Sequence, residues 1–313
     1  QVLGMLAAAV ALSHATTVDI VGEAWHINGR PSFKGRSWQG ESLEGLLFNS
    51  RMVNAIFDDV NGRTRDLWRY PDTLSWDAER HTNELVLALD DYWRHGLNAI
   101  TVGLQGGSPC GNNPADNSGV CGAMYERDSS AFAADGRLRP QWFRRLERVL
   151  RRADELGMIV LLQLFYPDEA HKIFAGNDSA VLAAADAAVD WLAQGGWTNV
   201  AIDVCNECDL CRVASPLCSA KRLALHHLNW PTGGAAPVEG GRLGELIVRI
   251  RQRLVTRGLP LPVTTSYLGG YLPEPEELQY LDFVNLHANN MWEWAEGSLV
   301  GMVDDVRGMA TYP

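Results

Sequence analysis

Apolar runs with strand-like spacing alternate with amphipathic runs with helical spacing along most of the chain. The strand-like runs cover residues 46–56, 99–104, 158–165, 200–204, 263–266 and 283–286. The helix-like runs cover residues 77–95, 141–156, 180–192, 243–254 and 299–306. Near-continuously apolar strands that alternate with helices are typical of parallel β/α units. The pattern therefore predicts an α/β fold with a mainly parallel sheet.

A β-hairpin is expected before the first β/α unit. The pair Asn28-Gly29 follows Trp25 and Ile27 and precedes Phe33. Asn and Gly favour the positive φ angles that a two-residue hairpin turn needs at both positions. The sequence therefore predicts a hairpin at the start of the folded region.

Two architectures fit alternating units, an open doubly wound sheet and a closed (β/α)8 TIM barrel. Polar or aromatic residues follow every strand-like run, and barrel enzymes take their site residues from the carboxyl ends of many strands. No G-x-G-x-x-G motif follows the first strand, so the pattern favours the barrel with an N-terminal hairpin. Only six strand-like runs are present, and strands seven and eight are expected to be missing.

Composition narrows the partners of the protein. The 313 residues carry a formal net charge of -11, with no run of basic residues longer than two, which argues against a nucleic-acid partner. Residues 2–12 are apolar and residues 13–15 are small or polar, so residues 1–15 are interpreted as a partial signal peptide; the alternative is a buried helix. We expect a secreted protein, not membrane-bound after signal cleavage, whose residues 16–313 form one barrel domain, incomplete at the C-terminus.

Six cysteines fit an oxidising compartment. Cys110 and Cys121 bracket a polar loop and are expected to pair. The other four are Cys205, Cys208, Cys211 and Cys218. We expect one disulfide among the last three and a free core thiol at Cys205. A zinc or iron–sulfur site is the alternative, although the spacing lacks a second matched pair.

The sharpest chemical feature is Asn206-Glu207 at the end of the apolar run 200–204. A carboxylate at a strand end is partly desolvated, which suits a general acid, and the adjacent Asn can bond a substrate hydroxyl without titrating. The alternative is that Glu207 begins a solvated loop. Asp203 is interpreted as a structural carboxylate facing the barrel interior.

These residues make the sequence similar to retaining glycoside hydrolases of the large (β/α)8 clan that includes the cellulase-like family 5 enzymes. The matching segments are residues 25–31 with Phe33, Asn206-Glu207 and His287. A closer likeness, to uncharacterised cellulase-like barrel proteins, rests on residues 44–53 and 104–109. The resemblance covers about residues 21–306 and is thin between residues 210 and 240.

The resemblance implies hydrolysis of O-glycosidic bonds in an oligo- or polysaccharide, without metal or cofactor. Glu207 would protonate the leaving oxygen and later deprotonate water, while a second Glu on strand seven attacks the anomeric carbon from ~5–5.5 Å away. Because that strand is missing, residues 1–313 are expected to be an inactive fragment. Glu293 is the nearest substitute by sequence.

Other strand-end residues are expected to bind substrate. They are Asn206, Arg51, Gln105, Tyr166, Tyr267, His287, Asn289 and Trp292. Arg51 is expected to keep the nucleophile ionised; an ion pair with Asp58 or Asp59 is its alternative. A buried structural role is the alternative for His287. Trp93, Trp142 and Trp191 lie in predicted helices and are assigned to the core.

Two other functions stay open for the whole chain. A non-catalytic carbohydrate-binding barrel would have the same fold but lack the second carboxylate. A barrel enzyme with a metal or iron–sulfur centre would use the cysteine cluster.

Overall fold

A parallel sheet forms the centre of the molecule. The computed structural model describes residues 16–106, 127–174, 177–207, 241–267, 272–273, 278–287 and 296–309. The sheet contains β6 (Asn49–Arg51), β7 (Ala99–Gly103), β8 (Ile159–Phe165), β9 (Val200–Cys205) and β10 (Val263–Thr264). Beyond β10, a parallel bridge joins Ser266 to Asn285.

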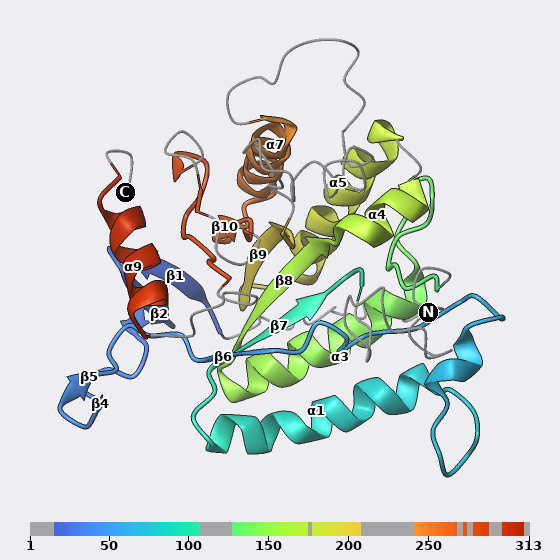
Figure 1. The fold of residues 1–313 in the computed structure, drawn as a ribbon, viewed down its shortest axis with the longest axis horizontal. Coiled ribbons are helices and arrows are strands. Elements are labelled where there is room, and N and C mark those ends of the chain that lie inside the picture. The colour runs from blue at the N-terminus through green and yellow to red at the C-terminus, as the bar shows by residue number, and fades with distance from the viewer. Residues whose placement is uncertain are drawn as a thin grey trace, which may run out of the picture.

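The strands follow one another across this sheet in chain order, β6-β7-β8-β9-β10 (Figure 1). A doubly wound sheet would instead reverse its strand order at a switch point, whereas a β/α barrel does not. The prediction of an α/β fold with parallel units in barrel order is therefore confirmed for the described residues.

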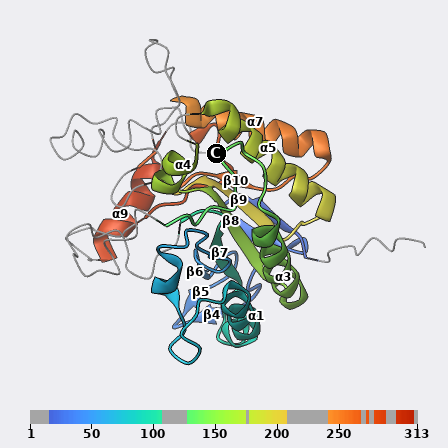
Figure 2. The same cartoon turned by 90° about the vertical axis from the view of Figure 1, so that its right-hand side faces the viewer.

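The helices cover one face of this sheet in the same succession. They are α1 (Ala78–Arg94), α3 (Pro140–Leu156), α4 (Pro167–Phe174), α5 (Asp178–Gly195), α7 (Gly241–Arg257) and α9 (Glu296–Arg307). Helix α1 packs along α3 (Figure 2). The Phe143 ring of α3 meets Trp191 of α5 edge-on at 5.0 Å, and Arg253 of α7 binds Asp190 of α5. Four neighbouring helices on one face leave the other face of the sheet turned inward, as in a barrel. Within the described ranges, no helix has both the length and the hydropathy of a membrane-crossing segment.

Capping residues explain where these helices begin and end. The Asp77 side chain accepts hydrogen bonds from the first-turn amides of Glu79 and Arg80, as expected of an N-cap. Helices α3 and α5 end at Gly157 and Gly196, whose φ angles of 70° and 68° suit glycine. The helix boundaries therefore lie close to those predicted, but three predictions need correction. The run 46–56 forms only the short strand β6, the run 283–286 forms only an isolated bridge at Asn285, and α4 was missed.

The N-terminal hairpin is confirmed. Strands β1 (Val18–Val21), β2 (Ala24–Ile27) and β3 (Arg30–Pro31) form an antiparallel sheet, and β4 (Ser37–Trp38) pairs with β5 (Glu41–Ser42). The turn between β2 and β3 is Asn28-Gly29, with φ angles of 55° and 72°. Both angles are positive, as the two-residue turn requires.

This hairpin closes the amino end of the inner face. Val18 and Trp25 pack with Leu161 of β8 and Ala201 of β9, and the Trp25 ring meets Phe283 edge-on at 4.8 Å. This apolar layer excludes water from the amino ends of the strands. Gln163 and Asp203 lie one layer nearer the carboxyl ends of the strands than Leu161 and Ala201.

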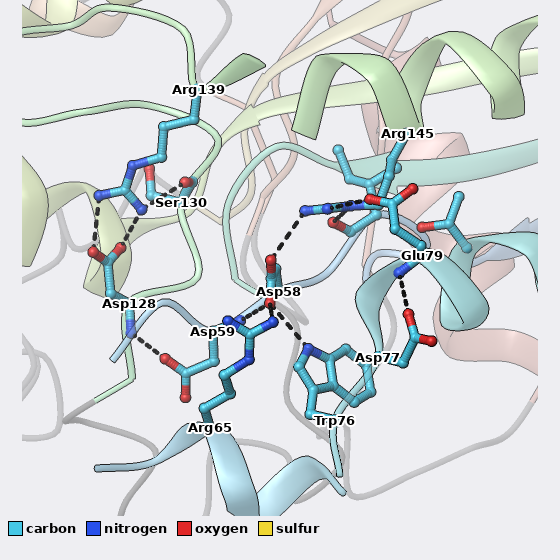
Figure 3. Close-up of polar contacts among 12 residues, drawn as sticks. Asp58, Asp59, Arg65, Trp76, Asp77, Glu79, Asp128, Ser130, Arg139 and Arg145 are labelled. Carbon is cyan, nitrogen blue, oxygen red and sulfur yellow. Dashed lines mark hydrogen bonds and ion pairs between the residues drawn. The ribbon is translucent and has the colours of Figure 1, made fainter. Parts of the chain in front are cut away.

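A buried charge network holds the segment between β6 and α1 (Figure 3). Arg145 of α3 is 1% exposed, donates to the Ile56 carbonyl at 3.2 Å, and pairs with Glu79 at 2.9 Å and Asp58 at 3.5 Å. Asp58 also accepts a hydrogen bond from Trp76 Nε1 at 3.0 Å. Each buried charge in this network therefore has an opposite charge or a hydrogen-bond donor beside it.

The neighbouring Asp59 organises the following turn. Its carboxylate accepts from Thr64 Oγ1 at 2.6 Å, from Trp68 Nε1 at 2.8 Å and from the Asp128 amide at 3.0 Å. Asp128 in turn binds Arg139 through both guanidinium nitrogens, as Figure 3 shows. These contacts join the loop after β6 to the segment before α3.

One core assignment was wrong. Trp142 is buried, but Trp93 near the end of α1 is 49% exposed. Its position in an amphipathic helix did not distinguish the covered face from the open one.

The Arg145 network predicts unequal effects at two arginines of α3. Arg145→Leu is expected to lower the free energy of unfolding by at most about 3–5 kcal/mol, because Asp58 loses its buried cation and keeps only the more exposed Arg65 at 3.7 Å. Arg148→Leu, which removes a one-third exposed partner of the same Glu79, is expected to cost less than about 1 kcal/mol. Urea unfolding followed by circular dichroism measures both. Equal losses would show that burial of Arg145 does not control its contribution.

Candidate active site

Two polar side chains lie inside the sheet, one layer above the apolar floor. Gln163 of β8 and Asp203 of β9 are register partners, 4% and 0% exposed. Gln163 Nε2 donates to Asp203 Oδ2 at 2.9 Å, and Asn285 Nδ2 donates to the same oxygen at 3.3 Å. The interior of the sheet therefore contains a carboxylate held by two amide groups.

Burial dominates the electrostatics of Asp203. Desolvation raises the pKa of its carboxyl to about 6, and the hydrogen bonds from Gln163 and Ser266 and the charge of His287 offset part of that effect. Its Oδ1 atom has no hydrogen-bond partner among the described residues. Asp203 therefore titrates near neutrality, well above an exposed aspartate.

Asn206 lies at the carboxyl end of β9 and is 2% exposed. Its Oδ1 accepts hydrogen bonds from Arg51 Nη2 at 2.7 Å and from Gln163 Nε2 at 3.1 Å. The predicted proximity of Arg51 and Asn206 is thus observed. Arg51 does not follow its alternative interpretation. Asp58 is bound by Arg145 and Trp76 (Figure 3), and Asp59 is bound by Thr64 and Trp68.

Glu207 directly follows Asn206 and faces His287. Its Oε1 lies 2.7 Å from His287 Nδ1, with the two side chains 16% and 13% exposed. A carboxylate oxygen only accepts, so the imidazole N–H is the donor in this contact. The φ angle of Glu207 is +55°, and its amide donates to Ser266 Oγ at 3.3 Å. Glu207, two residues beyond the end of β9, is therefore held by contacts of both its backbone and its side chain.

Gln105 and Tyr166 form a separate contact at the ends of β7 and β8. Gln105 is 3% exposed, donates to Ser130 Oγ at 2.9 Å and accepts from the Tyr166 amide at 3.1 Å. A Cβ atom at Gly106 would lie 2.9 Å from the Tyr166 ring, so glycine permits this approach. Both ends of the Gln105 amide are thus bonded within the protein.

Of the remaining predicted residues, the structure describes only Tyr267. Tyr267 is 1% exposed and belongs to the hydrophobic core. Asn289, Trp292 and Glu293 lie outside the described residues. The site on the described residues therefore consists of Arg51, Asn206, Glu207 and His287, with Gln163 and Asp203 beneath them.

Sequence reasoning missed two members of this arrangement, Gln163 and Asn285. Gln163 is the only polar residue in the apolar run 158–165, and that isolation was the available signal. Asn285 lies in a short run whose strand position depends on a single bridge to Ser266. Its proximity to Asp203 required the sheet order.

The cysteine predictions are partly corrected. Cys205 is disulfide-bonded, so the expectation of a free thiol is wrong. The other five cysteines lie outside the described residues. In the part of the chain that the structure describes, no three His, Cys, Asp or Glu side chains group as metal ligands.

Comparisons with known proteins give similarity to solved structures only. No protein-family model matches the chain, and no curated protein matches it in sequence. The chain is similar to an endocellulase from Pyrococcus horikoshii in complex with cellotetraose, at 12% identity and a TM-score of 0.40 over 92% of this chain. It is also similar to β-1,4-D-mannanase from Cryptopygus antarcticus, at 14% identity and a TM-score of 0.44 over 82% of this chain. A third similar structure is β-mannanase from the blue mussel Mytilus edulis, at 12% identity and a TM-score of 0.43 over 82% of this chain. This chain covers 65%, 62% and 64% of those chains, less than two thirds of each.

The raised pKa of Asp203 predicts a pH-dependent stability. Folding raises the pKa from 3.8 to about 6, so the stability contributed by this group is complete below pH ~3.8 and is lost as the pH rises through about 6. Between about pH 4 and pH 8, the wild-type protein is expected to lose about 3 kcal/mol of unfolding free energy relative to Asp203→Asn.

Urea unfolding of both proteins across this pH range measures the difference, in which the other titrating groups cancel. A difference that does not change with pH would contradict the prediction.

Proposed function

We propose that this chain belongs to a glycoside hydrolase that cleaves O-glycosidic bonds of an oligo- or polysaccharide with retention of configuration. Glu207 is its acid/base. The observation that carries the proposal is the 2.7 Å contact between Glu207 Oε1 and His287 Nδ1, next to Asn206 at the carboxyl end of the sheet. The imidazole fixes one carboxyl oxygen, and we assign proton transfer to the other.

The two steps of the reaction use Glu207 in opposite directions. In the first step its carboxyl group protonates the leaving glycosidic oxygen while the nucleophile attacks the anomeric carbon. In the second step its carboxylate removes a proton from the water that releases the sugar. The His287 N–H donor stabilises the Glu207 carboxylate that forms when Glu207 gives up its proton in the first step. Glu207 can therefore act as the acid in the first step and as the base in the second.

Asn206 is proposed to bind a substrate hydroxyl beside the scissile bond. Its Oδ1 is bonded to Arg51 and Gln163, and its Nδ2 makes no hydrogen bond within the described residues. We therefore assign the Asn206 Nδ2 group as the donor that faces the substrate. Tyr166, Asn289 and Trp292 remain proposed sugar contacts.

We place the nucleophile on a seventh strand outside residues 1–313, with a remaining N–H group of Arg51 donating to it. Residues 1–313 alone are then expected to be inactive, and the natural protein to be secreted through a signal peptide that includes residues 1–15. Sequencing of the transcript beyond the codon for Pro313 tests this placement. An apolar strand that ends in Glu supports it, and termination after Pro313 contradicts it.

Glu207→Gln is expected to lower turnover of β-1,4-glucan or β-1,4-mannan oligosaccharides by ~10²–10⁴-fold in the complete protein, because the amide can neither give nor take the proton. Aryl glycosides with a good leaving group are expected to lose less in the first step, since that step then needs little acid assistance. Product formation by each substrate measures both effects.

Glu245→Gln on the exposed face of α7 serves as the control and is expected to keep full activity. Full turnover by Glu207→Gln would remove Glu207 from the mechanism. Oligosaccharide binding without turnover by the complete wild-type protein would favour the carbohydrate-binding function instead.

A further inference from the structure

We propose that Gln163 and the buried Asp203 are positioning residues that set the orientation of the Asn206 side-chain amide. This inference deepens the proposed function and rests on it only for the identity of the ligand that Asn206 binds. The side chains form a continuous path, Asp203–Gln163–Asn206–Arg51, from the interior of the sheet to its carboxyl end.

The two ends of this path have fixed hydrogen-bonding polarity. The Arg51 guanidinium has donors only, so the Asn206 atom that faces it at 2.7 Å must be the oxygen. Ionised Asp203 has acceptors only, so the Gln163 atom that faces it at 2.9 Å must be the nitrogen. A cation at one end and an anion at the other therefore determine the direction of both amides.

Gln163 connects the two ends through one atom. Its Nε2 carries two hydrogens and donates to both Asp203 Oδ2 and Asn206 Oδ1, at 2.9 and 3.1 Å. The Asn206 oxygen thus receives two donors, and its Nδ2 group points away from both. If Gln163 turned its oxygen to this position, two amide oxygens would face each other.

Protonation of Asp203 removes the condition that fixes Gln163. A neutral carboxyl group donates from one oxygen and can bond the Gln163 oxygen, so the Asp203 contact no longer requires the Gln163 nitrogen, and only the Asn206 oxygen still does. Burial raises the pKa of Asp203 to about 6, which places this change in an accessible range. The charged or titratable groups around the path are His287, Glu207 and Arg51. Of these, His287 lowers the pKa of Asp203.

The test is a pH titration of the side-chain amide resonances in ¹³C,¹⁵N-labelled protein. In the wild type, the NH₂ signals of Gln163 and Asn206 and the Asn206 ¹³Cγ signal are expected to shift with the midpoint of the Asp203 carboxyl carbon. Asp203→Asn is expected to abolish that shift. In Gln163→Leu, the Asp203 carboxyl carbon is expected to titrate as before, and the pH-dependent shift of the Asn206 resonances is expected to disappear.

Two variants separate this path from other causes. Glu207→Gln is expected to keep the coupled titration, since Glu207 does not bond the Asn206 amide in the structure. Asn199→Ala removes a buried amide at the opposite end of β9, where it donates to the Leu150 and Met158 carbonyls. It is expected to lower the melting temperature and to leave the Asn206 titration unchanged.

The inference is overturned if the Asn206 resonances shift with pH in Gln163→Leu as much as in the wild type, or if this pH-dependent shift persists in Asp203→Asn. It is also overturned if the chemical shift of Asn206 ¹³Cγ at about pH 7.5 is the same in the wild type and in Gln163→Leu.

Binding of cellotetraose and mannotetraose by calorimetry keeps the two proposals distinguishable. Gln163→Leu is expected to weaken binding about tenfold, the effect of one misdirected hydrogen bond. Coupled amide titration without any oligosaccharide binding would reject the proposed function alone. Binding that is equal in wild type and Gln163→Leu would reject the positioning role alone.

Discussion

The hydrogen bond between Gln163 and Asp203 is the interaction on which the organisation of the site depends. Both residues lie on fully buried strands, where a polar side chain must find its partner within the sheet. The register of β8 with β9 places them opposite each other, so Gln163 Nε2 donates to one of the two Asp203 oxygens. The next polar residue upward, Asn206, then receives its orientation from below as well as from Arg51. The orientation of the Asn206 amide at the carboxyl end of the sheet thus depends on the contact between Gln163 and Asp203 in its interior.

The inner face of the sheet carries different kinds of side chain at its amino end, in its middle and at its carboxyl end. Val18 and Trp25 of the hairpin close the amino end with apolar contacts, and the layer above contains Gln163 and Asp203. Glu207 and His287 follow at the carboxyl end, where both side chains are partly exposed. The apolar closure and the residues of the proposed chemistry therefore lie in different layers of the same sheet. This division is typical of barrel proteins, whose sites lie at the carboxyl ends of the strands.

Local sequence predicted what depends on local physics. The Asn28-Gly29 turn and most helix and strand bounds followed from backbone preference and hydrophobic spacing. Arg51 and Asn206 were expected to belong to one site. Their direct hydrogen bond could be known only from the β6–β7–β8–β9 order of the sheet. Gln163 was missed because a single polar residue in an apolar run gives no period to detect. Trp93 and Cys205 were misassigned because helical spacing does not show which face is covered, and strand position does not show a covalent partner.

The backbone of Glu207 has a further consequence for how this position tolerates change. Its φ angle of +55° lies in the left-handed region, which costs a non-glycine residue about 1–2 kcal/mol. Glycine or asparagine would relieve that cost, but neither can transfer a proton as the proposed chemistry requires. Selection for stability alone would thus replace the one side chain to which we assign proton transfer. Under the proposed function, the fold carries a strained residue at this position so that a carboxyl group is available for proton transfer.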